Sequence, residues 1–86
     1  MNLDTIEEII DNPKIYKIIK SEMPTILTKS EYAIICLRYG VNGNLPLTRK
    51  EVSEKIDLSP SAVANIERRA LTKIRNRIKE LCFIKK

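Results

Sequence analysis

One stretch of the sequence, residues 58–75 (LSPSAVANIERRALTKIR), begins with small and polar side chains and continues with cationic ones. If this stretch is a helix, its first turns offer hydroxyl, methyl and amide groups, and the rest offers guanidinium and ammonium groups. An amide can pair with the edge of a base through two hydrogen bonds, and cations pair with phosphate oxygens. The chemistry available here is recognition of a polyanion such as nucleic acid.

A second helix is expected immediately before this stretch. Thr48 and Glu51 form a capping box, in which the hydroxyl and the carboxylate each satisfy a free backbone amide at the helix start. After a tight connection, Ser59 is a good N-cap, and Pro60 stands at the favoured first position of the next helix. Two helices separated by three or four residues, the second longer and more basic, are typical of a helix-turn-helix. In that motif the second helix enters the major groove of DNA by its amino-terminal end.

The helical register then identifies the residues that could contact bases. With the apolar stripe turned inward, four residues near the start of the second helix face outward: Ser61, Ala64, Asn65 and Arg68. Asn65 is the best candidate because its amide can pair with adenine, and Arg68 can address guanine or phosphate. Ser61 and Ala64 offer only a hydroxyl and a methyl-sized contact, so little base recognition is expected at this end.

Phosphate contacts are better supplied than base contacts. The candidates lie at the start of the first helix and along the second: Thr48, Arg49, Lys50, Arg69 and Lys73. A helix start already favours an anion, because its free amides and the helix dipole present positive charge. For Arg49, Lys50 and Arg69 the phosphate interpretation is favoured, whereas for Lys73 a side chain that faces water is the favoured interpretation.

The first half of the chain also predicts helices. Apolar residues recur at helical spacing in residues 3–10 and again in residues 15–23, with Asn12 and Pro13 between the two groups. Proline suits a first helical turn and not a helix interior, so the pattern predicts two short helices, the second ending before Pro24.

A helix over residues 28–39 is predicted by a second capping box, Thr28 with Glu31, and by Gly40 as its stop signal. It is apolar on almost every side, so more than one of its faces must be covered. Either the rest of the fold covers it completely or a partner protein covers one side.

The expected fold is an all-α domain of four to five helices with a C-terminal helix-turn-helix and a long last helix, because strand signals are absent. An apolar stripe marks the inner side of that last helix: Val63, Ile66, Ala70, Ile74, Ile78 and Leu81. We expect residues 1–26 to form an N-terminal helical segment that packs on a domain formed by residues 27–86.

Size and charge narrow the possible functions. A chain of 86 residues makes one small domain with little room for a deep substrate cleft. Residues 1–46 carry five Lys or Arg and six Asp or Glu, whereas residues 47–86 carry eleven and five, so the whole surplus of the +5 net charge belongs to the second half. This asymmetry suits a polyanion that touches one half, most simply nucleic acid, although a lysine-rich soluble surface explains the charge alone equally well.

Catalysis, metal binding and membrane insertion are not expected. The chain has no histidine, no Gly-rich phosphate loop, and two cysteines, Cys36 and Cys82, in apolar helical contexts. Buried free thiols therefore explain the cysteines better than a metal site does, and no cofactor is expected. No apolar run approaches the roughly 20 residues needed to span a bilayer, and the acidic start is unlike a signal peptide, so a cytoplasmic protein is expected.

Three motifs fall in the order and spacing of a known family: LRYG at 37–40, LT with EV at 47–52, and IERRALTKIR at 66–75. On these motifs, residues 27–75 resemble region 4, the carboxy-terminal region of bacterial sigma factors of the primary type. The last motif is specific, because helix-turn-helix proteins in general do not carry it.

The resemblance implies particular partners. Such a domain binds the minus-35 element of double-stranded promoter DNA with its last helix, and holds the flap-tip helix of the β subunit of core RNA polymerase on an apolar surface. It makes Thr48 and Arg49 candidates for a phosphate-contacting helix start, and Arg69 for a contact farther along the DNA backbone. The polymerase-binding candidates then lie on the apolar helix 28–39: Tyr32, Ile35, Cys36 and Tyr39.

Two departures from the family bear on target and role. The pairs Pro60-Ser61 and Ala64-Asn65 stand where primary sigma factors typically carry Arg-Glu and Arg-Gln, so a standard minus-35 sequence is not the expected target. The chain also has no candidate for the sigma regions that bind the core enzyme tightly and melt DNA. We therefore expect one subunit of a split sigma factor that works with a second sigma-like subunit, a small phage or mobile-element regulator, or an excised domain.

Three functions remain open. The leading hypothesis is a DNA-binding transcription regulator that also contacts RNA polymerase. A polymerase-binding decoy of anti-sigma type is favoured by the small side chains of Ser61 and Ala64 and opposed by Arg49, Lys50 and Asn65. An independent, dimeric regulator of the response-regulator output type would have similar helices, but the motif at 66–75 argues against it.

Overall fold

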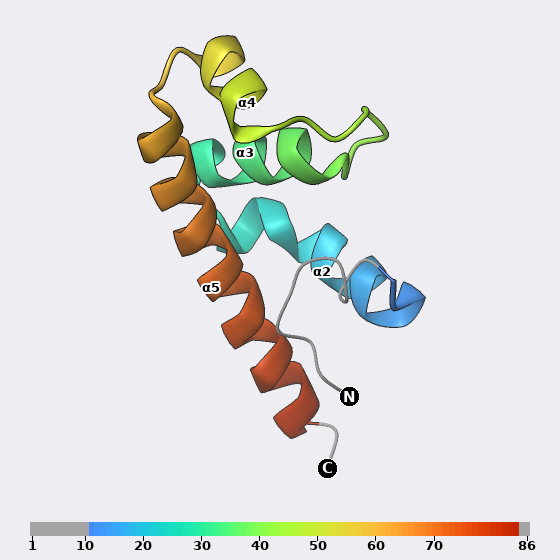
Figure 1. The fold of residues 1–86 in the computed structure, drawn as a ribbon. Coiled ribbons are helices and arrows are strands. Elements are labelled where there is room, and N and C mark those ends of the chain that lie inside the picture. The colour runs from blue at the N-terminus through green and yellow to red at the C-terminus, as the bar shows by residue number, and fades with distance from the viewer. Residues whose placement is uncertain (1–10, 85–86) are drawn as a thin grey trace.

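The computed structural model describes residues 11–84, with side chains up to Leu81. These residues form four helices and no strand: α2 (Pro13–Ile26), α3 (Lys29–Tyr39), α4 (Arg49–Ile56) and α5 (Pro60–Ile84). The predicted all-α class is confirmed, whereas the helix predicted within residues 3–10 lies outside the described residues. The long helix α5 runs along one side of the domain, and α4, α3 and α2 pack against it in succession (Figure 1).

The helix α2 begins as its sequence predicts and ends later. Its cap is Asn12, whose side-chain oxygen accepts a hydrogen bond from the Ile15 amide at 3.2 Å. The prediction that this helix ends before Pro24 is wrong, because the helix continues to Ile26 with the proline in its last turn. Proline removes one helical hydrogen bond, but the next turn still closes through the amide of Leu27, which donates to the Met23 carbonyl at 2.9 Å. Burial of the Met23 and Leu27 side chains holds this turn in place.

Both predicted capping boxes are present. The Thr28 hydroxyl accepts from the Glu31 amide at 3.2 Å while the Glu31 carboxylate accepts from the Thr28 amide at 2.9 Å, and Thr48 with Glu51 repeats this at 3.1 and 2.9 Å. Gly40 ends α3 with a φ of 65°, and a Cβ there would lie 2.4 Å from a backbone oxygen of the following loop. Only glycine fits this stop.

The connection between α4 and α5 is short and well defined. Asp57 takes a left-handed φ of 59° at the end of α4, and its amide donates to the Ser53 carbonyl. The Ser59 hydroxyl then accepts from the Ala62 amide at 3.1 Å, and Pro60 opens α5. The two helices are thus joined by three residues, 57–59, as a helix-turn-helix requires.

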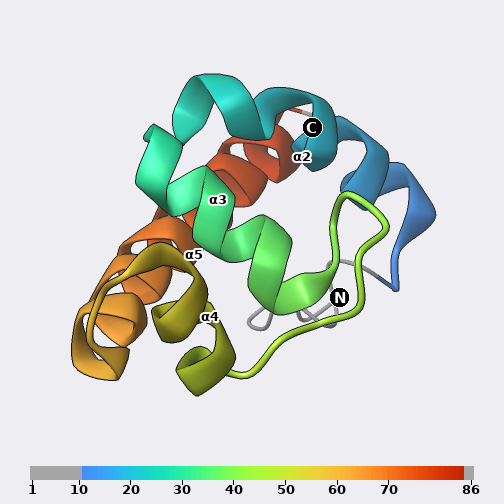
Figure 2. The ribbon, with the colours of Figure 1, turned by 90° about the horizontal axis from the view of Figure 1, so that it is seen from above.

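The core consists of two adjoining clusters that share α3 and α5. The larger lies between α2, α3 and α5: Ile19, Met23, Leu27, Ile35, Cys36, Val41, Ala70, Ile74 and Ile78. The smaller lies between α3, α4 and α5: Ile34, Val52 and Val63. Seen from above, α4 and the first turns of α5 lie side by side next to α3 (Figure 2). The smaller cluster therefore sets the angle between the two helices of the helix-turn-helix.

Candidate nucleic-acid interface

The start of α5 projects beside α4 with one side exposed. Ser61, Asn65 and Arg68 are exposed on this side and Ala64 is half-buried. Val63, on the opposite side, is fully buried against α3 and α4. The four side chains considered for base contacts therefore share one accessible side at the amino-terminal end of the long helix, the end that enters a major groove in this motif.

Two of these side chains, those of Asn65 and Arg68, are joined by a hydrogen bond. Nη2 of Arg68 donates to Oδ1 of Asn65 at 2.8 Å. An asparagine that reads adenine uses Oδ1 as an acceptor and its NH₂ group as a donor. While Arg68 occupies Oδ1, the Asn65 amide presents mainly its donor, so an adenine could pair with both groups of the amide only if Arg68 left Oδ1.

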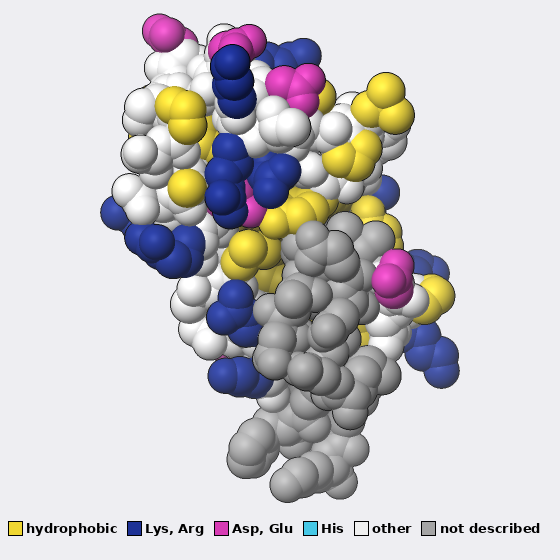
Figure 3. Space-filling model, in the orientation of Figure 1, with side chains coloured by type: hydrophobic (Ala, Val, Ile, Leu, Met, Phe, Trp, Pro, Cys, Tyr) yellow, Lys and Arg dark blue, Asp and Glu magenta, His cyan; other side chains and the backbone are white. Residues whose placement is uncertain are grey.

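The start of α4 presents a hydroxyl and two cations. Thr48, Arg49 and Lys50 are exposed. The Thr48 oxygen accepts within the capping box, which leaves its hydroxyl hydrogen available as a donor. Figure 3 shows Lys and Arg side chains over α4, over the neighbouring part of α3, and at intervals down α5. Free helix-start amides and added cations on one surface favour an anionic ligand such as phosphate.

A buried carboxylate lies behind these cations. Glu67 of α5 is only 2% exposed and accepts three hydrogen bonds from other helices. Tyr39 Oη donates to Oε2 at 2.6 Å, and Nε of Arg38 and Nε of Arg49 donate to Oε1 at 3.1 and 3.2 Å. Arg38 also donates from Nη1 to the Leu47 carbonyl at 2.8 Å, just before the start of α4. This network joins α3, α4 and α5 at one point.

Glu67 is ionised in this site. Burial would raise the pKa of its carboxyl group, but the hydrogen bonds from Tyr39, Arg38 and Arg49 outweigh burial and lower the pKa below its ordinary value. Sequence reasoning missed this residue. The sequence does place Glu67 on the inward-facing side of α5, one turn after Val63 and three positions before Ala70. An acidic side chain at such a position indicates a buried partner, because an unpaired charge there would strongly destabilise the fold.

Lys73 has a partner inside the domain. Its Nζ lies 2.7 Å from Oε1 of Glu31, a carboxylate that is 5% exposed at the start of α3. Burial would raise the pKa of Glu31, but hydrogen bonds from Lys73 and from Thr28 lower it. The sequence offered two roles for the Lys73 ammonium group, exposure to water or contact with a phosphate. The structure shows a third role, an ion pair that joins α5 to α3. Arg69, one turn earlier, is exposed.

The comparisons with known proteins bear on this interface. A family model described as Sigma-70, region 4 matches residues 26–76, which include α3, α4 and the first two thirds of α5. The chain belongs to the sigma-70 region 4 family. Region 4 is a DNA-binding transcription domain, so a DNA-binding regulatory role of the sigma region 4 type follows for this chain. Neither the comparison with curated proteins nor that with solved structures found a match.

Within this region 4 domain, the four side chains on α3 considered for polymerase contact differ in accessibility. Ile35 is fully buried and Cys36 is 6% exposed, both in the larger core cluster. Tyr32 and Tyr39 are only partly buried at its edge. As placed here, Ile35 and Cys36 cannot contact a partner, because α2 and α5 cover the side of α3 that they occupy. Burial also raises the pKa of the Cys36 thiol, which suits an unreactive core residue.

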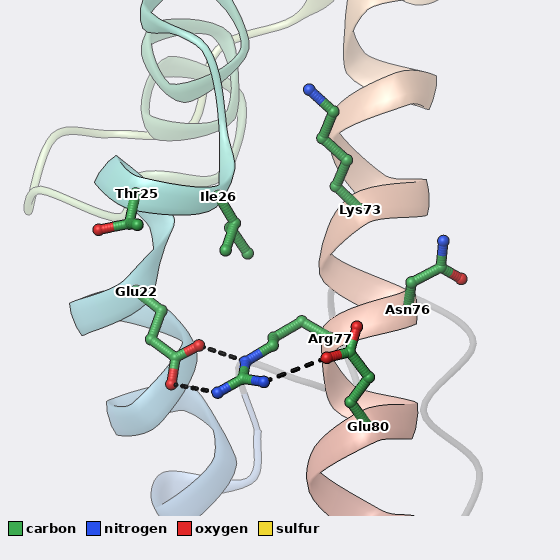
Figure 4. Close-up of a pocket in the computed structure, with 7 residues that line it drawn as sticks. All are labelled: Glu22, Thr25, Ile26, Lys73, Asn76, Arg77 and Glu80. Atoms are coloured by element: carbon green, nitrogen blue, oxygen red, sulfur yellow. Dashed lines mark hydrogen bonds and ion pairs between the residues drawn. The ribbon is translucent and has the colours of Figure 1, made fainter.

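A hollow between α2 and α5 is lined by residues on both sides of the boundaries of the region 4 match. The residues that line it are polar or charged except for Ile26: Glu22, Thr25, Ile26, Lys73, Asn76, Arg77 and Glu80. Arg77 reaches across from α5 to bind both carboxylate oxygens of Glu22 on α2, and also pairs with Glu80 on its own helix (Figure 4). Arg77 and Glu22 thus link α5 to α2 across this hollow, and Lys73 pairs with Glu31 beside it.

Two further observations limit the chemistry of the domain. Among the residues that the structure describes, no group of three or more His, Cys, Asp or Glu side chains could hold a metal ion. Over the same residues, no helix combines the length and the apolar character needed to cross a membrane.

Proposed function

We propose that this region 4 domain acts as a small transcription regulator, without catalysis of its own, that binds promoter DNA through α4 and α5 and also contacts RNA polymerase. The observation that carries this proposal is the placement of Arg49 and Lys50 at the start of α4 beside the exposed side of α5 that carries Asn65 and Arg68. Family membership supports the DNA-binding part.

In this proposal α4 contacts phosphates, and α5 contacts bases and one further part of the DNA backbone. Thr48, Arg49 and Lys50 bind phosphates at the start of α4, and Arg69 contacts the backbone farther along α5. Base contacts come from four residues: Ser61, Ala64, Asn65 and Arg68. Because only Asn65 and Arg68 in this set have long polar groups, most of the affinity comes from phosphate contacts and should fall steeply as salt rises. We assign Lys73 to its ion pair with Glu31 and not to DNA.

The polymerase contact is proposed on α3. Of the side chains considered there, Tyr32 and Tyr39 retain exposed surface, so they are the ones that could meet an apolar segment such as the β flap tip. Ile35 and Cys36 would support that surface from the core. The Tyr39 hydroxyl donates to Glu67, and the Arg38 guanidinium lies 5.2 Å from the centroid of the Tyr39 ring.

A polymerase-binding decoy with little DNA specificity is the second candidate. It is favoured by one observation, the small size of Ser61 and Ala64 at the tip of α5, where base-reading side chains would stand. The two functions differ in whether a particular DNA sequence is needed.

The experiment is a pull-down of the purified chain with core RNA polymerase, followed by selection of promoter templates from a randomised library on the complex. Retained polymerase together with an enriched DNA motif supports the regulator. Retained polymerase without any motif supports the decoy. If no polymerase is retained, the proposed contact on α3 is wrong, and DNA selection on the chain alone then tests the remaining half of the proposal.

A further inference from the structure

The guanidinium group of Arg49 makes a hydrogen bond within the domain through Nε and not through its two terminal nitrogens, among the described residues. Its Nε donates to Oε1 of Glu67 at 3.2 Å, and no other hydrogen bond of its guanidinium group occurs among the described residues. The Arg49 side chain is 54% exposed, whereas that of Glu67 is 3% exposed. The inner edge of the guanidinium group therefore faces the core, and its two terminal nitrogens remain for a ligand outside.

The carboxylate that holds Arg49 is itself fixed. Tyr39 binds Oε2 at 2.6 Å and Arg38 binds Oε1 at 3.1 Å, both from α3. Arg38 is further tied to the Leu47 carbonyl, two residues before Arg49. An exposed arginine normally loses rotamer entropy when it binds a phosphate, and a fixed acceptor behind it removes part of that loss before binding. A planar guanidinium held at Nε can still present a two-pronged donor to phosphate oxygens.

We propose that Glu67 is a positioning residue of the DNA interface, which holds Arg49 through Nε so that the two terminal nitrogens of Arg49 bind one DNA phosphate. This inference rests on the proposed function and deepens it. Glu67 itself does not touch DNA. Its role is to turn a flexible surface cation into an oriented phosphate ligand at the start of α4.

Simple electrostatics predicts the opposite effect of removing Glu67. A negative charge close to a DNA-binding surface repels phosphates, so its replacement by a neutral group of the same shape should strengthen DNA binding. If Glu67 orients Arg49, the same replacement weakens binding instead. The sign of the change therefore separates a positioning role from a mere background charge.

The test uses the full chain, a fluorescein-labelled DNA duplex of about 25 base pairs with random sequence, and anisotropy titrations over a series of salt concentrations. For Glu67→Gln we expect binding about tenfold weaker, comparable to the loss of one charge-assisted hydrogen bond. We also expect the slope of log K against log salt to shrink by about 0.9, the value for one phosphate. Arg49→Ala should give the same change, and the double variant no further one.

The matched control is Glu31→Gln. Glu31 is also a buried carboxylate with a cation from another helix, and glutamine keeps its capping box. Glu31→Gln should lower the free energy of unfolding without a change in the slope of log K against log salt. Circular dichroism of both variants measures the loss of stability, and the slope measures whether Arg49 is still oriented. Tighter binding, or an unchanged slope, for folded Glu67→Gln would overturn the inference.

Arg49→Lys tests the inference even if Glu67→Gln does not fold. The lysine keeps the charge at an exposed position, but its single ammonium group cannot pair with Glu67 through one nitrogen and present a fork with two others. We expect it to lose nearly as much of the salt slope as Arg49→Ala. A wild-type slope for Arg49→Lys would show that charge alone suffices, and would overturn the inference while the proposed function stands. If the wild-type chain does not bind the duplex at all, the DNA-binding proposal itself fails.

Discussion

The side chains of Asn65 and Arg68, one turn apart on the exposed side of α5, are joined by a hydrogen bond of 2.8 Å from Nη2 to Oδ1. These are the two long polar groups among the proposed base-contact residues, so the base recognition proposed for them would begin from this hydrogen-bonded pair. A base that replaces Arg68 at Oδ1 also releases the arginine for a second contact. The two residues are therefore expected to act as a unit on DNA.

The first prediction concerns this pair. Asn65→Ala should narrow the difference in affinity between a selected DNA sequence and random DNA by about 1–3 kcal/mol, the contribution of one bidentate base contact. Arg68→Ala should narrow it as well, and the double variant should lose less than the sum of the two because they share a bond. Lys79→Ala, an exposed cation farther along α5, serves as the control. Strict additivity would mean that the two side chains read DNA separately.

The second prediction concerns the cations at the start of α4. Arg49→Ala and Lys50→Ala should each weaken binding to selected and random DNA by about the same factor, because phosphates carry no sequence information. Asn65→Ala should instead affect the selected sequence most. Parallel anisotropy titrations with both duplexes measure the ratio of the affinity for selected DNA to that for random DNA. Equal losses of specificity from all three variants would show that the assigned roles are wrong.

The third prediction is a dependence of stability on acid. The pKa values of Glu67 and Glu31 are lowered in the fold by their hydrogen-bonded partners, despite burial. A group with a lowered folded pKa contributes stability that is present above its unfolded pKa, about 4.3, and is lost as the pH falls through the folded value. Melting temperatures should be level between pH 7 and 5 and fall progressively below about pH 4.3.

Variants of these carboxyl groups sharpen that test. Glu67→Gln should be less stable at pH 7, because it leaves Arg38 with a weaker buried partner, and should lose less stability between pH 5 and 3 than the wild type. Thermal unfolding at each pH by circular dichroism gives both quantities. An identical acid dependence in the variant would exclude Glu67 as a contributor.

The fourth prediction concerns α2, most of which lies outside the matched region. Met23 is fully buried between α2, α3 and α5, so Met23→Ala should cost about 2–5 kcal/mol of unfolding free energy and lower the melting temperature by about 10 °C or more. Lys20→Ala, at an exposed position on the same helix, should change it little. Similar melting temperatures for both variants would mean that α2 is not part of the cooperative fold.

The amino-acid sequence alone predicts the parts of the structure that depend on neighbours three or four residues away. Capping boxes at Thr28 and Thr48 and the N-cap at Ser59 were predicted correctly, because their hydrogen bonds close within one turn. The stop at Gly40 was equally local, since only glycine fits its positive φ. The helix-turn-helix followed from these caps and the short connection between the two helices, and the family motifs added its sigma region 4 class.

Which charged and apolar groups meet across the core depends on how the helices pack. Glu67 bonds to partners 18 to 29 positions away, and Lys73 to Glu31 across 42 positions. No pattern in the sequence fixes such pairs, because they depend on how three helices are oriented. Helix α2 likewise continues past Pro24 because burial of the Met23 and Leu27 side chains offsets one missing hydrogen bond. Side-chain type thus fixed which groups could bind DNA, whereas packing decided which of them are free to do so.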